Sequence, residues 1–412
     1  MMRSTTRSVA SCLALALAAA LAPGAALADG MIFGDVSATA AVQATEQRAV
    51  LWLRDGSWEI HIQPVFPRDA GAAAWVVPFT ARPTVMQGNA DFIDQLELLT
   101  SPIFVEYCWG SASGGCGMKA VGGDSNGTAT SQEASVTVWE QGEVGSLDYV
   151  ILTASEGGDI AAWLSAEGYE VPAGAATLLS ALDADGVFFF AARLDAAADP
   201  TTPLAPIRFV LPDMDTPTYP LRLTALGVPA GDALDLTVWI IVPDGDQAWA
   251  PSSHPFETLR SYLLDEDLPR TPAEYSTALD SFFSDHPAGT FLLLDERTTW
   301  EIDESIDAEA FFTSDYFLMI PFADVGIEPP ATWAGEFTIL ATTTNYVYRY
   351  QARLEADGMT GDLVLGERSF SSMPWASRAF EFARGSCDDD DPMSYGCAAV
   401  PLRPGRAGLA GL

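Results

Sequence analysis

Short runs in which apolar and polar residues alternate constrain the fold of this chain more than any other feature. Trp58, Ile60 and Ile62 alternate with polar residues, and Asp55-Gly56 separates this run from an apolar run over residues 49–53. A period of two is typical of a strand with one buried face, and Asp-Gly favours a two-residue hairpin turn. The pattern predicts a β-hairpin over residues 49–62.

Similar runs recur along the chain, whereas helical patterns are few and short. The apolar run 74–79 indicates an interior strand that ends at Pro78. We expect further hairpins and strands over residues 135–152, 187–194, 207–211, 221–226, 236–242, and 346–365 around Asp357-Gly358. Helices are expected over residues 91–99, 159–167, 175–182 and 272–284. The fold class is therefore α+β and β-dominated, with antiparallel sheets and a few short helices.

The first 28 residues have the features of an export signal. Arg3 and Arg7 form a basic head, residues 12–27 are apolar and rich in alanine, and Ala26-Leu27-Ala28 gives the small-x-small pattern that signal peptidase recognises. We expect cleavage between Ala28 and Asp29 and a mature protein that is secreted or periplasmic. No later run is long and apolar enough to span a bilayer, so we expect no membrane span in the mature chain.

The chain is strongly acidic, and this limits its partners. It has 56 Asp and Glu residues against 20 Lys and Arg residues, which gives a formal net charge of −36. Removal of the two signal-peptide arginines takes this charge from −36 to −38. Such a surface repels phosphate backbones and anionic headgroups, so we expect no nucleic acid and no lipid surface as a partner.

A change of composition suggests where the chain divides. Several prolines and the run Asp265-Glu266-Asp267 interrupt the strand pattern between residues 244 and 272. This predicts a β-rich amino-terminal domain over residues 29–250, an α+β carboxy-terminal domain over 251–398 and a flexible tail over 399–412, after a signal peptide over 1–28.

Four cysteines remain after the expected cleavage: Cys108, Cys116, Cys387 and Cys397. An even number in an exported chain favours disulfides, and the sequence spacing favours Cys108–Cys116 and Cys387–Cys397 over the crossed pairings. A zinc site with four thiolates is the alternative, but the chain has no C-x-x-C pair.

Four stretches carry a resemblance to a known family: residues 48–56 with 74–78, residues 147–152 ahead of the Trp163 helix, residues 219–225, and residues 353–365. In these stretches the chain resembles a family of exported bacterial proteins catalogued as domain of unknown function 2330. The resemblance spans nearly the whole mature chain and implies export, but it assigns no catalytic residue. Many members have a cysteine-rich start where this chain has residues 29–33, so an amino-terminal disulfide of the family is absent here.

One motif points to an enzyme. Gly123-Asp-Ser-Asn-Gly127 matches the G-x-S-x-G pattern and makes Ser125 the candidate nucleophile of an esterase-like serine hydrolase. A nucleophile elbow needs a buried strand before the serine and a helix after it, whereas residues 111–131 are rich in Gly, Ser and Thr. The available bases, His61, His254 and His286, are interpreted as solvated or turn residues. We therefore expect no catalytic residue and keep the hydrolase as the alternative.

Acidic residues next to a cysteine suggest a cation site. Asp388, Asp389, Asp390 and Asp391 follow Cys387 directly, and carboxylate oxygens are the ligands that calcium prefers. The run completes no EF-hand loop. A solvated acidic turn and a weak calcium site both fit it, and we expect no other cofactor.

The chain has 11 tryptophans, and tryptophan in an exposed position is a common platform for sugars. Most of them alternate in phase with apolar residues and are assigned to the core, so Trp109 and Trp249 are the better surface candidates. The sequence therefore favours a non-enzymatic envelope or extracellular protein with a binding or structural role. Its expected partner is an envelope protein or a glycan.

Overall fold

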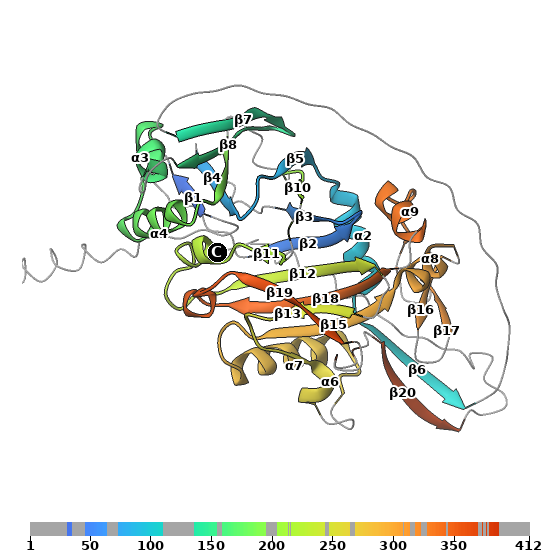
Figure 1. Cartoon of the computed structure of the whole chain (residues 1–412). Coiled ribbons are helices and arrows are strands. Elements are labelled where there is room, and N and C mark those ends of the chain that lie inside the picture. Colours follow the sequence, from blue (N-terminus) through green and yellow to red (C-terminus); the bar gives the residue numbers. More distant parts are fainter. Residues whose placement is uncertain are drawn as a thin grey trace, which may run out of the picture.

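A computed structural model gives the architecture of the chain. It describes residues 31–386 except 35–45, 64–72, 110–135, 155–158, 195–203, 213, 215, 244–246, 264–267, 308, 314–317, 323–327, 343–344, 370–372, 374–375 and 377–378. The described part is β-dominated with mostly antiparallel sheets and short helices, which confirms the predicted fold class (Figure 1).

An eight-stranded sheet forms the centre of the molecule. Its order is β14 (Phe256–Thr258), β15 (Phe291–Thr298), β18 (Asn345–Leu354), β12 (Leu234–Pro243), β2 (Glu46–Arg54), β3 (Ser57–Gln63), β10 (Ile207–Leu211) and β5 (Thr84–Gln87). All neighbours are antiparallel except β12 with β2 and β14 with β15. The expected domain boundary near residue 250 lies between strands of this one sheet, since β18 pairs with β12 and joins β15 and β14 to the strands that precede residue 250.

The first predicted hairpin is confirmed as β2 and β3. Asp55 and Gly56 both have positive φ, 52° and 78°, between the paired residues Arg54 and Ser57. A two-residue turn of this type matches the twist of the strands, and the small Asp and Gly tolerate the left-handed backbone.

A second layer covers one face of the central sheet. It contains the five-stranded antiparallel sheet β1 (Met31–Gly34), β4 (Ala73–Phe79), β9 (Phe188–Leu194), β8 (Leu147–Ala154) and β7 (Val136–Val144), and the three-stranded sheet β11 (Thr218–Tyr219), β19 (Leu363–Ser369) and β13 (Gln247–Pro251). Side chains interdigitate between the layers, since Phe190 meets Phe209 of the central sheet edge-on at 4.9 Å. Within its own sheet Phe190 also meets Trp75 at 5.4 Å. The main apolar core lies between these sheets.

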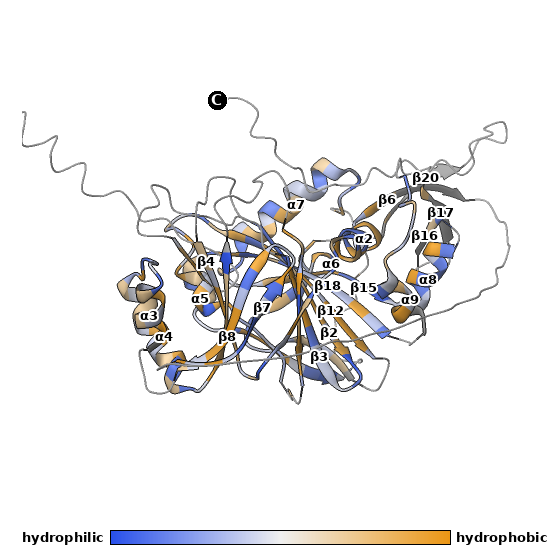
Figure 2. Cartoon of the chain, turned by 90° about the horizontal axis from the view of Figure 1, so that it is seen from above, coloured by the Kyte–Doolittle hydropathy of each residue, from blue (hydrophilic) through white to orange (hydrophobic). Residues whose placement is uncertain are grey.

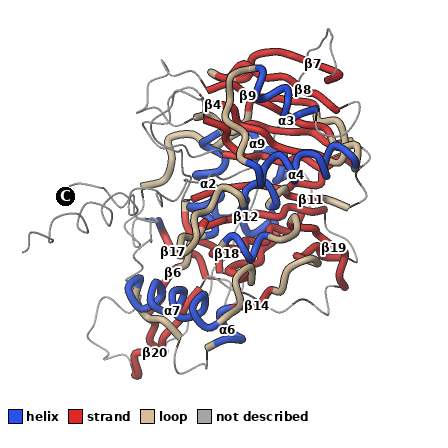
Figure 3. The backbone as a smooth tube through the Cα atoms, turned by 90° about the vertical axis from the view of Figure 1, so that its left-hand side faces the viewer, coloured by secondary structure: helices blue, strands red, loops and turns tan. Residues whose placement is uncertain are grey.

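Helices cover the two outer faces (Figures 1 and 3). The five-stranded sheet packs against α3 (Asp159–Ala166) and α4 (Ala173–Ala184), and the central sheet packs against α2 (Ala90–Thr100), α8 (Thr299–Asp307) and α9 (Gly335–Thr342). A further cluster contains α6 (Leu259–Tyr262) and α7 (Pro272–Asp285). The strands in the middle of the molecule carry much of the apolar colour in Figure 2. None of the helices in the described segments has the length and apolar composition needed to cross a membrane.

The remaining elements lie outside these three sheets. They are β6 (Ile103–Trp109) paired in parallel with β20 (Ala379–Ser386), the hairpin β16 (Ala310–Thr313) and β17 (Leu318–Pro321), the helical turn α5 (Arg222–Ala225) and the 3-10 turn η4 (Ala356–Met359).

Two local predictions are wrong. Residues 221–226 contain the helical turn α5 (Arg222–Ala225) instead of a strand, and Asp362 accepts hydrogen bonds from the backbone N–H groups of Leu221 and Arg222 at 3.0 and 2.9 Å. A side chain from far along the chain thus satisfies the donors at the start of this turn. The strands β18 and β19 exist, but they belong to different sheets and form no hairpin.

Candidate functional site

Several predicted site residues lie outside the described residues. They are the cleavage position Ala28–Asp29, Cys116, Ser125, Cys387, Cys397 and the run Asp388, Asp389, Asp390 and Asp391. Cys108 lies on β6, whose last residue Trp109 pairs with Ser386 of β20. The disulfide and calcium sites therefore stay predictions.

The solvated interpretation of His61 is wrong. Its exposed fraction is only 1%, because α2 covers this face of β3 and the ring of Phe92 lies 5.7 Å from the imidazole. His61 Nε2 is 3.5 Å from Glu59 Oε2, and both side chains are buried. Strand alternation placed His61 on a polar face, but a helix buries that face.

Glu59 is a buried carboxylate held by two arginines. Its Oε1 lies 2.8 Å from Arg54 Nη2 and 2.7 Å from Arg208 Nη2. Burial by itself would raise the pKa of Glu59, but the adjacent His61 and the two arginine charges outweigh it and lower the pKa. Glu59 is therefore ionised at neutral pH and ties β2, β3 and β10 together. Among the described residues, no three His, Cys, Asp or Glu side chains gather as a metal ion would require.

The structure brings one serine to a histidine. Ser253 Oγ lies 2.8 Å from His254 Nδ1 and 2.9 Å from the carbonyl oxygen of Asp362, and it accepts a hydrogen bond of 2.8 Å from the backbone N–H of Val364. His254 Nε2 lies 3.3 Å from the carbonyl oxygen of Gly358, and burial lowers the pKa of this imidazole. The contacts to backbone groups fasten this loop to β19. His286 is placed elsewhere, as the residue that ends α7, and stacks on Phe282 at 4.0 Å.

Among the side chains that the structure describes, the most exposed large aromatic on a sheet is Trp139, on the edge strand β7. Its exposed fraction is 40%. Val138 pairs with Leu152 and Glu140 pairs with Ile151, so Trp139 is the extra residue of a β-bulge. A bulge re-aims a side chain, and here it presents an indole at the rim of the five-stranded sheet.

Polar groups hold this indole in place. Its Nε1 donates to Thr153 Oγ1 at 3.0 Å, and the Arg82 guanidinium carbon lies 5.5 Å from the ring centroid. Arg82 Nη2 donates to the Trp139 carbonyl oxygen at 3.3 Å and to Glu140 Oε2 at 3.1 Å. We call Arg82, Trp139, Glu140 and Thr153 the Trp139 surface.

A second layer fixes Glu140. The Tyr149 hydroxyl donates to Glu140 Oε1 at 2.8 Å. Burial, together with this hydrogen bond and the charge of Glu140, raises the pKa of Tyr149, so the phenol remains a neutral donor. Gly142 makes room for the tyrosine, since a Cβ at this position would lie 3.2 Å from its ring and hydroxyl. The polar rim of the Trp139 surface is thus set by packing as well as by charge.

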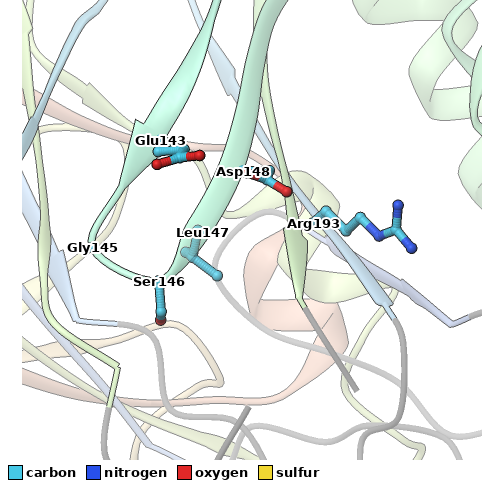
Figure 4. A pocket seen from close by; sticks show the side chains of 6 residues that line it. All are labelled: Glu143, Gly145, Ser146, Leu147, Asp148 and Arg193. Atoms are coloured by element: carbon cyan, nitrogen blue, oxygen red, sulfur yellow. The ribbon is translucent and has the colours of Figure 1, made fainter. Parts of the chain in front are cut away.

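The tip of the same hairpin bears a pocket lined by Glu143, Gly145, Ser146, Leu147, Asp148 and Arg193, whose side chains are shown in Figure 4. Glu143 and Asp148 are cross-strand partners, and Asp148 is also the partner of Arg193 on β9. All three charged side chains are exposed, and Arg193 extends away from the two carboxylates in Figure 4. Most of the residues that line this pocket are polar or charged, whereas pockets for small molecules are lined mainly by apolar side chains.

The sequence-based choice of surface tryptophans is corrected for Trp249. It is partly buried and packs edge-on against Trp58 at 5.3 Å. The side chain of Trp109 lies outside the described residues. Besides Trp139, Trp300 on α8 is exposed, with a fraction of 41%. A signal for Trp139 was present, because it is out of phase with Val136 and Val138 on its strand.

Comparison with known proteins gives one match. The sequence model of a family described as an uncharacterized protein conserved in bacteria (DUF2330) matches residues 23–242, more than half of the chain. No curated protein and no solved structure matches.

Proposed function

This chain belongs to the uncharacterized bacterial family DUF2330, and we propose that it is an exported, non-enzymatic protein of the cell envelope or extracellular space that binds a partner at the Trp139 surface. The basic head, the apolar run and the small residues before Asp29 support export. The resemblance over the mature chain supports the same placement.

One observation carries the binding role: a large indole is exposed at a position where neighbouring side chains fix its orientation. Tryptophan dominates many binding surfaces because it offers a large contact area at a low cost in conformational entropy. In Trp139 the ring nitrogen is already satisfied by Thr153, so the exposed part of the indole is apolar. A partner can therefore cover it without leaving a polar atom unpaired.

The test is saturable binding of the purified mature protein, residues 29–412, to envelopes isolated from the producing bacterium. We expect Trp139→Ala to weaken this binding and Trp300→Ala, which removes an equally exposed indole from α8, to leave it unchanged. Equal binding by wild type and Trp139→Ala would refute the proposal.

The esterase-like hydrolase is the second candidate, and the 2.8 Å contact between Ser253 and His254 favours it. A serine activated by a base reacts with a fluorophosphonate probe, whereas a hydroxyl held only by backbone groups does not. Under the binding proposal the wild type remains unlabelled. Labelling that disappears in Ser253→Ala or Ser125→Ala would identify the nucleophile and establish the hydrolase instead.

A further inference from the structure

We propose that the ligand of the Trp139 surface is an uncharged polysaccharide, with a sugar ring against the indole and its hydroxyl groups on Arg82 and Glu140. This rests on the proposed function and names its ligand class. Three observations support the assignment: the polar groups around the Trp139 indole, the net charge of the protein and the bulge in β7.

The groups around the ring suit vicinal hydroxyls. In the described contacts Arg82 uses only Nη2, so its Nε–H and Nη1–H groups are available as donors. Each oxygen of Glu140 accepts one hydrogen bond, from Tyr149 and from Arg82, and a carboxylate oxygen has capacity for another. A sugar offers an apolar ring face bordered by hydroxyls that both donate and accept, which matches an indole with a donor and an acceptor beside it.

The charge of the protein favours a neutral polysaccharide over an anionic one as the ligand. The Arg82 and Glu140 charges cancel within the Trp139 surface, while the whole chain carries a net charge of −36. An anionic polysaccharide would have to approach against this field without gaining a local excess of positive charge. An uncharged polymer pays no such cost.

The bulge makes an extended peptide the less suitable ligand. An edge strand can bind a peptide by adding it as another strand, and this needs a regular row of backbone donors and acceptors. Trp139 interrupts that row as the bulged residue of β7. Bulges at sheet edges are a known device against strand addition. Recognition at this edge therefore depends on side chains.

The experiment is affinity electrophoresis of the mature protein in gels that contain dextran, glycogen or a soluble β-glucan as neutral probes, and polygalacturonate as the anionic probe. We expect at least one neutral probe to retard the wild type and polygalacturonate to leave it unretarded. Trp139→Ala should weaken the binding at least about tenfold, which corresponds to about 1.4 kcal/mol. Trp139→Phe should retain part of the retardation, and Trp300→Ala should retain all of it.

The folded state of each variant is checked by its circular dichroism and its melting temperature. The ligand assignment is overturned if no neutral probe retards the wild type, or if retardation survives in Trp139→Ala. In that case the envelope-binding assay still tests the proposed function, independently of the sugar assignment. If protease treatment of the envelopes abolishes Trp139-dependent binding, the Trp139 surface binds a protein. The proposed function then holds, and the assignment of a polysaccharide as the ligand is wrong. If envelope binding never depends on Trp139, both fail.

Discussion

Glu296 should make the stability of the protein depend on pH around neutrality. It lies half-buried on β15 opposite Tyr348. Burial foremost, and then the charges of Asp295 and Glu301, raise its pKa from 4.5 to about 7. The folded state therefore disfavours the ionised carboxylate. The favourable contribution of the neutral form is complete below pH 4.5 and is lost as the pH rises through about 7.

The magnitude follows from these two pKa values. A difference of about 2.5 between the folded and unfolded states corresponds to about 3.4 kcal/mol. Because Glu296 is only half-buried, solvent screening reduces this to about 1–2 kcal/mol. Glu296→Gln keeps the shape of the side chain and cannot ionise. It should raise the free energy of unfolding at pH 8, and the gain should exceed the gain at pH 5 by about 1 kcal/mol.

The assay is urea denaturation of wild type and variant at pH 5 and pH 8 at one ionic strength. Removing any carboxylate also relieves repulsion in a chain with a net charge of −36, so the control is Glu167→Gln at an exposed position after α3. The reasoning is refuted if Glu296→Gln, corrected by this control, gives the same gain at both pH values.

The other predictions concern the segments around the described fold. Peptide mapping without reduction should show the disulfides Cys108–Cys116 and Cys387–Cys397 in exported protein. Because Trp109 pairs with Ser386, the neighbouring Cys108 and Cys387 are the alternative pair, and a disulfide between them would contradict the prediction. Amino-terminal sequencing of protein from its native host should begin at Asp29, and an intact Met1 would argue against export by this signal. About 1 mM calcium on a site of about 0.1 mM affinity should stabilise the fold by roughly 1.4 kcal/mol, a rise of a degree or two in melting temperature. The rise should be absent in the double variant Asp389→Asn with Asp390→Asn at matched ionic strength. If calcium raises the melting temperature of wild type and variant equally, the run is a solvated acidic turn and no calcium site.

Features determined by neighbouring residues were predictable from the sequence. The β2–β3 hairpin follows from the alternation around Trp58 and from Asp55-Gly56, which supplies the turn within two residues. The helix α2 was also expected, and Asn89 Oδ1 caps it by accepting from the backbone N–H of Asp91 at 3.0 Å. In both cases the decisive contacts lie a few positions apart.

Features determined by distant residues were not predictable. The strand-like run 221–226 contains a helical turn, and Asp362, about 140 positions away, caps it. His61 is buried because α2 returns over its strand, and hydrophobic alternation does not report what covers a face. The phase of Trp139 against Val136 and Val138 was a signal for its exposure, but its place in a bulge shows only in the register between β7 and β8. The candidate surface thus arises from tertiary context, although its residues stand in ordinary strand patterns.

The pairing of β12 with β18 has a consequence for any shorter version of this protein. All ten residues of β12, from Leu234 to Pro243, pair with β18, while the family match ends at residue 242. A fragment that stops there keeps β2 on one side of β12 but leaves the other side as a long apolar edge, which is prone to aggregate. During synthesis and export about a hundred residues must follow β12 before its second neighbour arrives. We therefore expect that residues 23–242, the part matched by the family model, do not fold as an independent unit in this chain.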